Sequence, residues 1–274
     1  MDIDKIRHSL AHILAYSIQD LYPGTKFGIG PVIENGFYYD FDLPAGQSGL
    51  PKSLAPENLA KVEARMRELV KRNINFEKKL ISKEEAKKIF KNQPYKLELL
   101  NEFYPKESSG KVSVYKSGEF LDLCKGNHVK STKEIPIDGF KLIKLAGAYW
   151  RGSEKNPMLT RIYGVAFSSK KELDEYLTLQ TEAEKRDHRK LGEKLDLFSF
   201  HDVSPGAAFW HPKGMIIFKE LEKWWREKHE NLGYLEISTP IMVKKSLFEK
   251  SGHWEHYREN IITFEIEKEI YALK

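Results

Sequence analysis

The chain has 274 residues, of which 41% are hydrophobic and 31% are charged, and its formal net charge is +5. This composition is typical of a soluble globular protein, and the length indicates about two domains. Cys124 is the only cysteine, so the sequence excludes an internal disulfide. No run approaches the ~18 apolar residues of a membrane span, and the acidic N-terminus lacks a signal-peptide pattern. We therefore expect a cytoplasmic protein without a membrane partner.

The first predicted element is a helix over residues 4–21, where apolar side chains recur at helical spacing before Pro23-Gly24. His8 and His12 are four residues apart, so they lie on one face of this helix, one turn apart. A lone pair of histidines at this spacing is more often two partly exposed helix residues than a functional site. A function for this pair therefore requires further side chains that the fold brings to the same place.

An α+β domain with antiparallel sheet is predicted for the next part of the chain. Residues 27–42 predict a β-hairpin, because Asn35-Gly36 is a pair that a type I′ turn favours. The elements that follow are a loop at 44–54, a helix at 56–72, a strand at 76–80, a helix at 82–91, an ambiguous helix or strand at 94–100, and strands at 112–115, 120–123, 140–145 and 161–167. Residues 147–152 are expected to connect the last two strands.

The composition changes at residue 170. Residues 170–192 predict one long charged helix with a thin apolar stripe, which we interpret as a connector between domains. A second region then begins, with a helix at 215–231 and a strand at 233–240 that ends at a proline. Because residues 271–274 again have the pattern of a strand, we expect this second domain to be incomplete.

Cys124 and His128 lie directly after a predicted strand, where loops often carry functional side chains. With His8 and His12 they make a possible tetrahedral zinc set, since zinc binds nitrogen and sulfur ligands in fours. The same residues suit metal-free hydrolysis, because a histidine can position or deprotonate a water near neutral pH. Asp122 could orient an imidazole or a substrate amine. Spacing alone leaves both chemistries open, and an isolated cysteine is more often a buried structural thiol.

Several motifs resemble the threonyl-tRNA synthetase family, in the order in which that family has them. Those of its editing domain are RHSLAH at 7–12, IGPVIENGFYYD at 29–40, DLCKGNH at 122–128 and AGAYWRG at 146–152. Those of its later parts are DHRKLG at 187–192, WHPKG at 210–214 and KSGHW at 250–254. The segment GYLEISTP at 233–240 resembles motif 1 of class II synthetases, which lies at the dimer interface in that family.

The resemblance implies three parts. We expect an editing domain at 1–168, a linker helix at 169–186, and the N-terminal part of a class II catalytic domain at 187–274, which includes motif 1 and is incomplete. In this family the whole enzyme ligates threonine to tRNA(Thr) with ATP. Motifs 2 and 3 and the sites for ATP, Mg and Zn are expected outside this chain, which would retain only the hydrolysis of mischarged Ser-tRNA(Thr). Its partners would be the tRNA(Thr) acceptor end and, as in the homodimers of the family, a second copy of the chain.

The residues that the resemblance places around the ester are His8, His12, Lys96, Asp122, Cys124 and His128. Asp122 or Lys96 would fix the seryl group, and Lys96 could stabilise negative charge on the carbonyl oxygen. The three imidazoles would orient the terminal adenosine and the attacking water. Cys124 would act mainly by packing and by restricting access to the site, and less as a nucleophile. Editing in this family is expected to need no cofactor, while the four possible zinc ligands keep metal binding open.

Two other functions remain open. One is a stand-alone zinc-dependent aminoacyl-tRNA deacylase of the alanyl-editing type, since those proteins share the two ligand spacings but not the later motifs. The other is a tRNA-binding fragment without catalytic activity. Sensitivity of hydrolysis to a chelator would favour the first, and RNA binding without turnover would favour the second.

Overall fold

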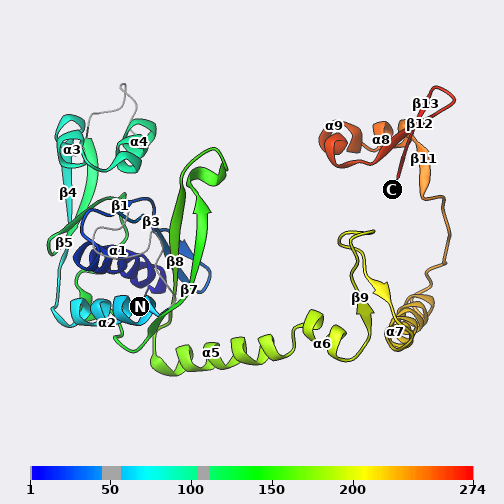
Figure 1. The fold of residues 1–274 in the computed structure, drawn as a ribbon, viewed down its shortest axis with the longest axis horizontal. Helices are drawn as coiled ribbons and strands as arrows, with labels where there is room; N and C mark the ends of the chain where they lie inside the picture. Colours follow the sequence, from blue (N-terminus) through cyan, green and yellow to red (C-terminus); the bar gives the residue numbers. More distant parts are fainter. Residues whose placement is uncertain (1, 45–56, 104–110, 274) are drawn as a thin grey trace. The chain divides into compact units, whose positions relative to one another are not determined.

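The computed structural model describes residues 2–44, 57–103 and 111–273 (Figure 1). It divides into two compact units, Met1–Lys185 and Arg186–Lys274. The loop predicted at 44–54 lies outside the described residues except for its first position. None of the described helices is long and apolar enough to cross a membrane.

Unit 1 combines helices with two antiparallel sheets, which confirms the mixed α and β architecture. The first sheet has the order β1–β3–β8–β7 with β2 paired to β3, and its strands are β1 (Lys26–Phe27), β2 (Val32–Ile33), β3 (Gly36–Asp42), β7 (Phe140–Tyr149) and β8 (Met158–Ala166). The second sheet has the order β4–β5–β6, and its strands are β4 (Phe76–Ser82), β5 (Lys111–Ser117) and β6 (Phe120–Leu123). The α-helices are α1 (Ile3–Leu21), α2 (Asn58–Lys71), α3 (Lys83–Ile89), α4 (Pro94–Phe103) and α5 (Lys170–Lys185).

Helix α1 lies at the centre of unit 1 and packs against α2, β3 and β6 (Figure 1). Its N-terminus is capped by Asp2, whose carboxylate accepts a hydrogen bond from the backbone N–H of Asp4 at 3.2 Å. Every residue from Ile6 to Ile18 is buried except His8. A helix enclosed in this way holds its side chains in fixed positions, and the one interruption of its burial lies at a candidate site residue.

The hairpin of β2 and β3 is confirmed, but the predicted type I′ turn is wrong. Ile33 pairs with Gly36, so the connecting residues are Glu34-Asn35, and neither has the positive φ that this turn requires. Gly36 is needed for another reason, because a Cβ there would lie 2.0 Å from the carbonyl oxygen of Gly164 on β8. The glycine therefore permits a close approach of β3 to β8 rather than a left-handed turn.

The ambiguous stretch at 94–100 is helical and belongs to α4. Pro94 occupies the first position, where its missing N–H removes no helical hydrogen bond. Tyr95, Leu99 and Leu100 are buried at helical spacing, so tertiary packing selects the helix over a strand. The same packing directs the buried Lys96 into the interior of unit 1.

Strands β7 and β8 are longer than predicted, and residues 147–149 continue β7 instead of connecting the two strands. The small residues in this segment have a low strand propensity, which cross-strand pairing overrides. The chain leaves β7 in a 3-10 turn at Trp150–Gly152. There the buried Trp150 donates a hydrogen bond from its indole N–H to Glu98 on α4 at 2.8 Å. The end of this hairpin is thus attached to the helix that carries Lys96.

The helix predicted at 170–192 is in fact two helices, α5 and α6 (His188–Lys194). Asp187 caps α6, since its carboxylate accepts a hydrogen bond from the backbone N–H of Arg189 at 2.9 Å. A side chain that bonds to a nearby backbone N–H in this way competes with a continuous helix. The spacing of charged residues in the sequence gives no sign of this competition.

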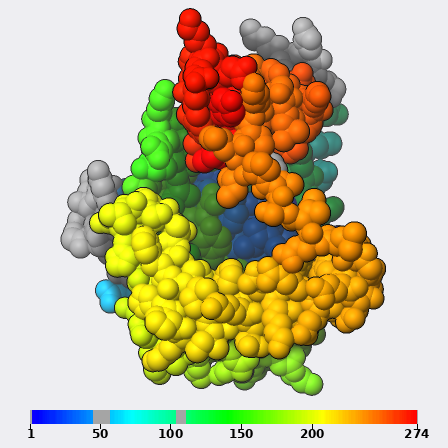
Figure 2. Space-filling model, turned by 90° about the vertical axis from the view of Figure 1, so that its right-hand side faces the viewer, coloured from blue at the N-terminus to red at the C-terminus, as the bar shows by residue number. Residues whose placement is uncertain are grey.

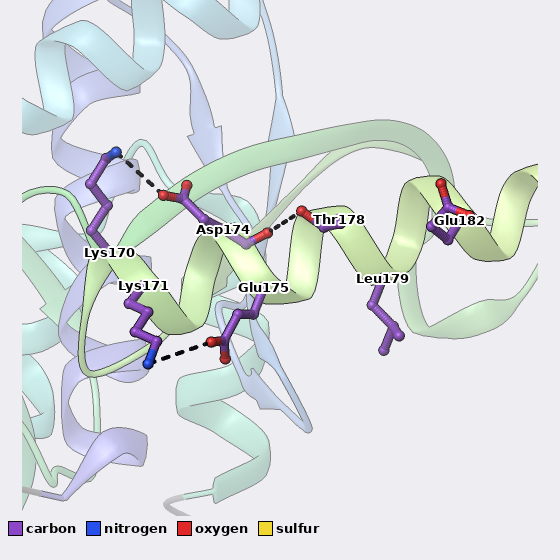
Figure 3. Close-up of a pocket in the computed structure, with 7 residues that line it drawn as sticks. All are labelled: Lys170, Lys171, Asp174, Glu175, Thr178, Leu179 and Glu182. Carbon is purple, nitrogen blue, oxygen red and sulfur yellow. Dashed lines mark hydrogen bonds and ion pairs between the residues drawn. The ribbon is translucent and has the colours of Figure 1, made fainter.

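Helix α5 is stabilised along its exposed surface by ion pairs between successive turns (Figure 3). Lys170 pairs with Asp174 at 3.3 Å, and Lys171 pairs with Glu175 at 3.9 Å. The shallow groove beside these pairs is lined by residues of this single helix. We therefore interpret it as solvated helix surface.

Unit 2 (yellow to red in Figure 2) contains two small antiparallel sheets, β10–β9 and β11–β13–β12. Its elements are α6, β9 (Phe198–Ser199), β10 (Phe209–Trp210), α7 (Pro212–Glu230), β11 (Met242–Lys244), α8 (Lys245–Lys250), α9 (His253–Tyr257), β12 (Thr263–Ile266) and β13 (Glu269–Leu273). The helix predicted at 215–231 and the strand predicted from residue 271 are confirmed as α7 and β13. The strand predicted at 233–240 is wrong, because residues 234–240 are neither helix nor strand. Leu235 and Ile237 are 90% and 80% exposed, so their apolar pattern has no neighbouring strand to pair with.

Candidate functional site

Three segments of unit 1 bring the six predicted site residues to one place. Helix α1 carries His8 and His12, α4 carries Lys96, and β6 with the loop after it carries Asp122, Cys124 and His128. The segments are distant in sequence, since Cys124 follows His8 by 116 positions. The convergence that the sequence motifs require is therefore present, while the catalytic role of these residues stays a prediction.

Cys124 lies between two imidazoles. Its Sγ is 3.4 Å from Nε2 of His8 and 3.3 Å from Nε2 of His128. The ring centroid of His128 lies 4.1 Å from that of His8 and 4.3 Å from that of His12. We call these four side chains, His8, His12, Cys124 and His128, the imidazole–thiol cluster.

The backbone of the loop after β6 explains why its cysteine and histidine face each other. Gly126 has a φ of +128° and Asn127 a φ of 67°, both in the left-handed region that glycine and asparagine tolerate best. A Cβ at Gly126 would also lie 2.9 Å from the hydroxyl of Tyr115. This tight turn reverses the chain within four residues and returns His128 to the Sγ of Cys124.

A buried polar network adjoins the cluster. The ammonium group of Lys96 donates to Asp122 Oδ1 at 2.5 Å and to the hydroxyl of Tyr39 at 2.8 Å. The Tyr39 hydroxyl donates in turn to Asp122 Oδ2 at 2.5 Å, and Nε2 of His12 lies 3.9 Å from the same oxygen. Lys96 and Asp122 are each only 3% exposed. Burial of an ion pair is costly unless additional hydrogen bonds satisfy both charges, and Tyr39 supplies them here.

Burial sets the protonation of the cluster. It lowers the pKa of His8, and it lowers the pKa of His12 and of His128 well below the usual value of 6.5. Burial, and then the charge of Asp122, raise the pKa of the Cys124 thiol to about 12. At neutral pH the cluster therefore consists of neutral imidazoles and a protonated thiol. Since the thiolate is the nucleophilic form of cysteine, Cys124 is poorly suited to attack a substrate.

A cavity of about 350 Å³ opens beside the cluster and the polar network. Its lining residues come from α1, the segment before β2, α4, β6 and the loop after β6, and they are His8, Ile29, Gly30, Pro31, Lys96, Leu99, Phe103, Asp122, Leu123, Cys124, Lys125 and Gly126. The cavity is thus lined by charged and imidazole groups together with apolar groups. A small polar ligand can reach four of the six predicted site residues from this cavity.

The cluster has the donor set of a zinc site. Its four ligand atoms lie within 4.8 Å of one another. Zinc bonds of roughly 2.0–2.3 Å in a tetrahedron would separate nitrogen and sulfur ligands by roughly 3.3–3.6 Å. The two distances from the Cys124 Sγ already fall close to this range. In addition, Nδ1 of His12 is buried without a partner among the described residues. The residues therefore fit zinc, and they also fit a metal-free site that holds water.

Sequence reasoning missed two polar residues that contact the predicted ones. Tyr39 lies in an aromatic strand, and its ring is buried and stacks on that of Phe41. The available signal was its hydroxyl, which needs a partner when a tyrosine is buried. Ser9 lies between the two histidines of α1, and its hydroxyl contacts the His128 ring at 3.2 Å. No pattern in the sequence connects Ser9 with a residue 119 positions away.

The comparisons with known proteins agree with the resemblance of the motifs. Residues 112–163 match the family described as threonyl and alanyl tRNA synthetase second additional domain. This segment includes the part of the site that follows β5 and excludes the two histidines of α1. The matched segment therefore contains β6 and the loop with Cys124 and His128.

Curated relatives extend the similarity to the whole chain. The threonine–tRNA ligases of Thermotoga sp. (strain RQ2) and Carboxydothermus hydrogenoformans are each 49% identical to it, over 98% and 99% of its length. That of Thiobacillus denitrificans is 47% identical over 99% of its length. The chain spans about 40% of the length of these relatives. The solved structure of the RNA binding domain of threonyl-tRNA synthetase from Cryptosporidium parvum Iowa II is 38% identical, covers 32% of this chain and 22% of that chain, and has a TM-score of 0.32.

Proposed function

Because this chain is related to threonine–tRNA ligases over nearly its whole length, we propose that unit 1 hydrolyses the ester of mischarged Ser-tRNA(Thr). The observation that carries the proposal is the cavity, which joins the buried Lys96–Asp122 pair to the imidazole–thiol cluster. In the reaction a water oxygen attacks the carbonyl carbon of the ester. The bond from that carbon to the ribose oxygen breaks, the ribose oxygen takes a proton, and serine leaves as the free amino acid.

Lys96 is suited to bind the carbonyl oxygen of the ester. An ammonium group has three N–H bonds, and Asp122 and Tyr39 accept two of those of Lys96. The third is available to an oxygen atom in the cavity that Lys96 lines. Negative charge develops on the carbonyl oxygen in the transition state, and a preorganised donor at that position is worth roughly 10²–10³ in rate. Asp122 acts chiefly by holding the ammonium group of Lys96 in place.

His8 is suited to position the attacking water. It is the only residue between Ile6 and Ile18 that is not buried, and it lines the cavity. Its lowered pKa keeps the ring neutral, so one ring nitrogen can accept a hydrogen bond from water at neutral pH. A lowered pKa also makes the ring a weak base, and its contribution is therefore to orient the water more than to retain its proton. The Cys124 thiol packs against the ring and narrows the cavity.

A second site that discriminates between serine and threonine is useful because one binding step is not selective enough. Serine lacks one methyl group of threonine, and a group of that size gives only about 1–3 kcal/mol of discrimination in one binding step. A separate cavity that admits the seryl ester and excludes the threonyl ester adds a second step. The apolar wall of Ile29, Pro31 and Leu99 faces the same cavity as Lys96 and is the part that a methyl group would meet.

The assignment of the rest of the chain follows from the same relationship. We assign residues 1–168 to the editing domain, 169–186 to the linker helix and 187–274 to the first part of a class II catalytic domain with motif 1 at 233–240. For the ligation of threonine with ATP, we propose that the sites for ATP, Mg and Zn lie outside these 274 residues. The tRNA(Thr) acceptor end is the partner of unit 1, a homodimer is the expected assembly, and the cytoplasm is the expected location.

A zinc-dependent deacylase of the alanyl-editing type is the second candidate, because the four ligand atoms of the cluster lie within 4.8 Å of one another. His8, His12, Cys124 and His128 would hold the ion. A catalytic zinc would supply a water of lowered pKa only at an open position, so this water would take a fifth position or replace one of the four protein ligands. The positions of Lys96 and Asp122 beside the cavity would be unchanged in this alternative.

Hydrolysis of Ser-tRNA(Thr) by this chain without ATP tests the proposal, with and without a chelator and beside Cys124→Ala. Hydrolysis that is indifferent to the chelator and reduced less than about ten-fold in Cys124→Ala is expected for a metal-free site. Loss of hydrolysis in the chelator would instead favour the zinc-dependent deacylase. Binding of tRNA by a folded chain that does not turn over would leave a tRNA-binding fragment as the better description.

A further inference from the structure

Ser9 is buried completely on α1, between His8 and His12. Its hydroxyl oxygen accepts a hydrogen bond from the backbone N–H of Val129 at 3.1 Å. The same oxygen lies 3.2 Å from Nδ1 of His128. Among the described residues these are the two hydrogen-bond contacts of this hydroxyl. A serine on the first helix thus holds both the loop after β6 and the ring of its histidine.

The direction of the bond between Ser9 and His128 follows from counting protons. A hydroxyl group has one proton and two acceptor positions, and the N–H of Val129 fills one acceptor position. The proton of Ser9 needs an acceptor, because an unsatisfied buried donor is costly. Ser17 on the same helix bonds back to the carbonyl oxygen of Ile13 at 2.8 Å, a contact of the kind that Ser9 does not make. The acceptor that remains for Ser9 is Nδ1 of His128.

We propose that Ser9 is a positioning residue that fixes His128 in the tautomer with its proton on Nε2. A neutral imidazole that accepts at one nitrogen carries its proton on the other. The Nε2–H of His128 then donates to the Sγ of Cys124, 3.3 Å away. The thiol proton in turn points to Nε2 of His8 at 3.4 Å. The result is a directed chain of hydrogen bonds from Ser9 through His128 and Cys124 to His8.

The direction of this hydrogen-bond chain gives His128 and His8 opposite roles. This step of the inference rests on the proposed hydrolysis. His128 presents a donor toward the cluster, and His8 presents an acceptor beside the cavity. A water in the cavity can then donate to His8 only by displacing the thiol proton, so the thiol rotates as the water binds. This tautomer also disfavours zinc binding. The Nε2 of His128 faces the Sγ of Cys124 and would be the zinc ligand, but in this tautomer it carries a proton.

The test is the tautomer of His128 in the full chain, measured by ¹⁵N NMR with labelled histidine, in wild type and Ser9→Ala. We expect the proton on Nε2 in wild type and a mixture of both tautomers in Ser9→Ala. Ser17→Ala is the matched control, since it removes an equally buried hydroxyl from the same helix without touching the cluster. It should leave the His128 signals unchanged, and Ser9→Thr should restore the wild-type tautomer.

A proton on Nδ1 of His128 in wild type, or the same tautomer in Ser9→Ala as in wild type, would overturn the inference. The wild-type spectrum alone identifies the tautomer of His128, even if Ser9→Ala fails to fold. Hydrolysis of Ser-tRNA(Thr) should also fall roughly 10–100-fold in Ser9→Ala, by analogy with residues that orient metal-bound histidines. The NMR result needs no tRNA, so a chain with the expected tautomer and no hydrolysis would contradict the proposed function and leave the tautomer assignment intact.

Discussion

Both units of the molecule contain a serine bonded to an imidazole, but in different surroundings. In unit 2, Ser199 Oγ lies 2.9 Å from Nε2 of His211, and Nδ1 of His211 lies 2.7 Å from Asp196 Oδ1. These contacts have the order of a Ser-His-Asp triad, and they are shorter than the contact of Ser9 with His128 in unit 1. The side chains of His211 and Asp196 are nevertheless 34% and 64% exposed. Water competes for each of these hydrogen bonds.

The difference teaches that hydrogen-bond distances alone do not define a site. His211 is the N-cap of α7, so the contacts in unit 2 join β9 to the start of that helix. In unit 1 Ser9 is buried and His128 is half-buried, burial shifts the protonation of His128, and a cavity adjoins its neighbours His8 and Cys124. A low-dielectric environment strengthens each interaction and makes each unpaired group costly. We therefore propose catalysis for unit 1 and a structural role for the network in unit 2.

The largest expected effect that separates the two regions is on hydrolysis. His8→Ala should lower the rate with Ser-tRNA(Thr) by roughly 10²–10⁴-fold, because it removes the group that positions the water. His211→Ala should change that rate by less than about two-fold. Single-turnover hydrolysis by the two variants makes the comparison. Equal losses in both would remove the distinction between the regions.

A large effect on stability is expected at the buried ion pair. Lys96→Met leaves the carboxylate of Asp122 buried without its counter-charge, which typically costs about 3–5 kcal/mol. The matched control is Lys170→Met on α5, where the partner Asp174 lies at 3.3 Å on an exposed surface. That change should cost less than about 1 kcal/mol. Urea unfolding of both variants gives the free energies, and a cost at Lys96 no larger than at Lys170 would contradict the buried network.

Acid should destabilise unit 1 in the absence of bound metal. The folded-state pKa values of His8, His12 and His128 lie below 6.5, whereas unfolding returns them to about that value. As pH falls below 6.5, the unfolded chain binds protons that the folded chain does not, so the free energy of unfolding decreases. The slope is at most about 1.4 kcal/mol per pH unit for each such histidine. Urea unfolding with a chelator between pH 7.5 and pH 5 measures it, and a flat profile in that range would contradict the neutral cluster.

Alkaline pH should also destabilise unit 1, through the thiol of Cys124. Its folded-state pKa is raised to about 12, compared with an ordinary value of 9.0. Between these values the unfolded thiol loses its proton and the folded thiol keeps it, so stability decreases as pH rises above about 9. Cys124→Ala should lose this part of the pH dependence. A variant with the wild-type alkaline profile would show that another group is responsible.

The smallest effect is expected in unit 2. Ser199→Ala removes two contacts with imidazoles on a partly exposed surface, which should cost about 1 kcal/mol or less because water replaces them. It should leave hydrolysis by unit 1 unchanged. Thermal unfolding and the same deacylation assay check both points. Loss of hydrolysis in Ser199→Ala would place the network of unit 2 in the function.

The sequence predicted most elements because their signals are local. The apolar spacing of residues 4–21 and the aromatic residues of β3 are properties of the residues themselves. The strand predicted at 233–240 failed because a strand needs a neighbour, and Leu235 has none. The helix at 170–192 failed because one capping side chain, Asp187, divides it. Neither failure is visible in periodicity.

The site was predicted from a resemblance and completed by the fold. The two spacings of histidine and cysteine suggested a cluster, but Lys96 had no local signal and entered only through the family motifs. Tyr39 and Ser9 could not be found in either way, since their roles depend on which groups their hydroxyls meet across the sheet and the helix. Long-range hydrogen bonds of this kind are set by tertiary packing.

The measurement that tests the central claim most directly is the ratio of hydrolysis rates for Ser-tRNA(Thr) and Thr-tRNA(Thr), at equal concentrations of this chain and without ATP. An editing site in unit 1 predicts that the seryl ester is hydrolysed at least about ten-fold faster, as expected for exclusion of one methyl group from a fitted cavity. Equal rates for the two esters, or no hydrolysis of either by the folded chain, would contradict it.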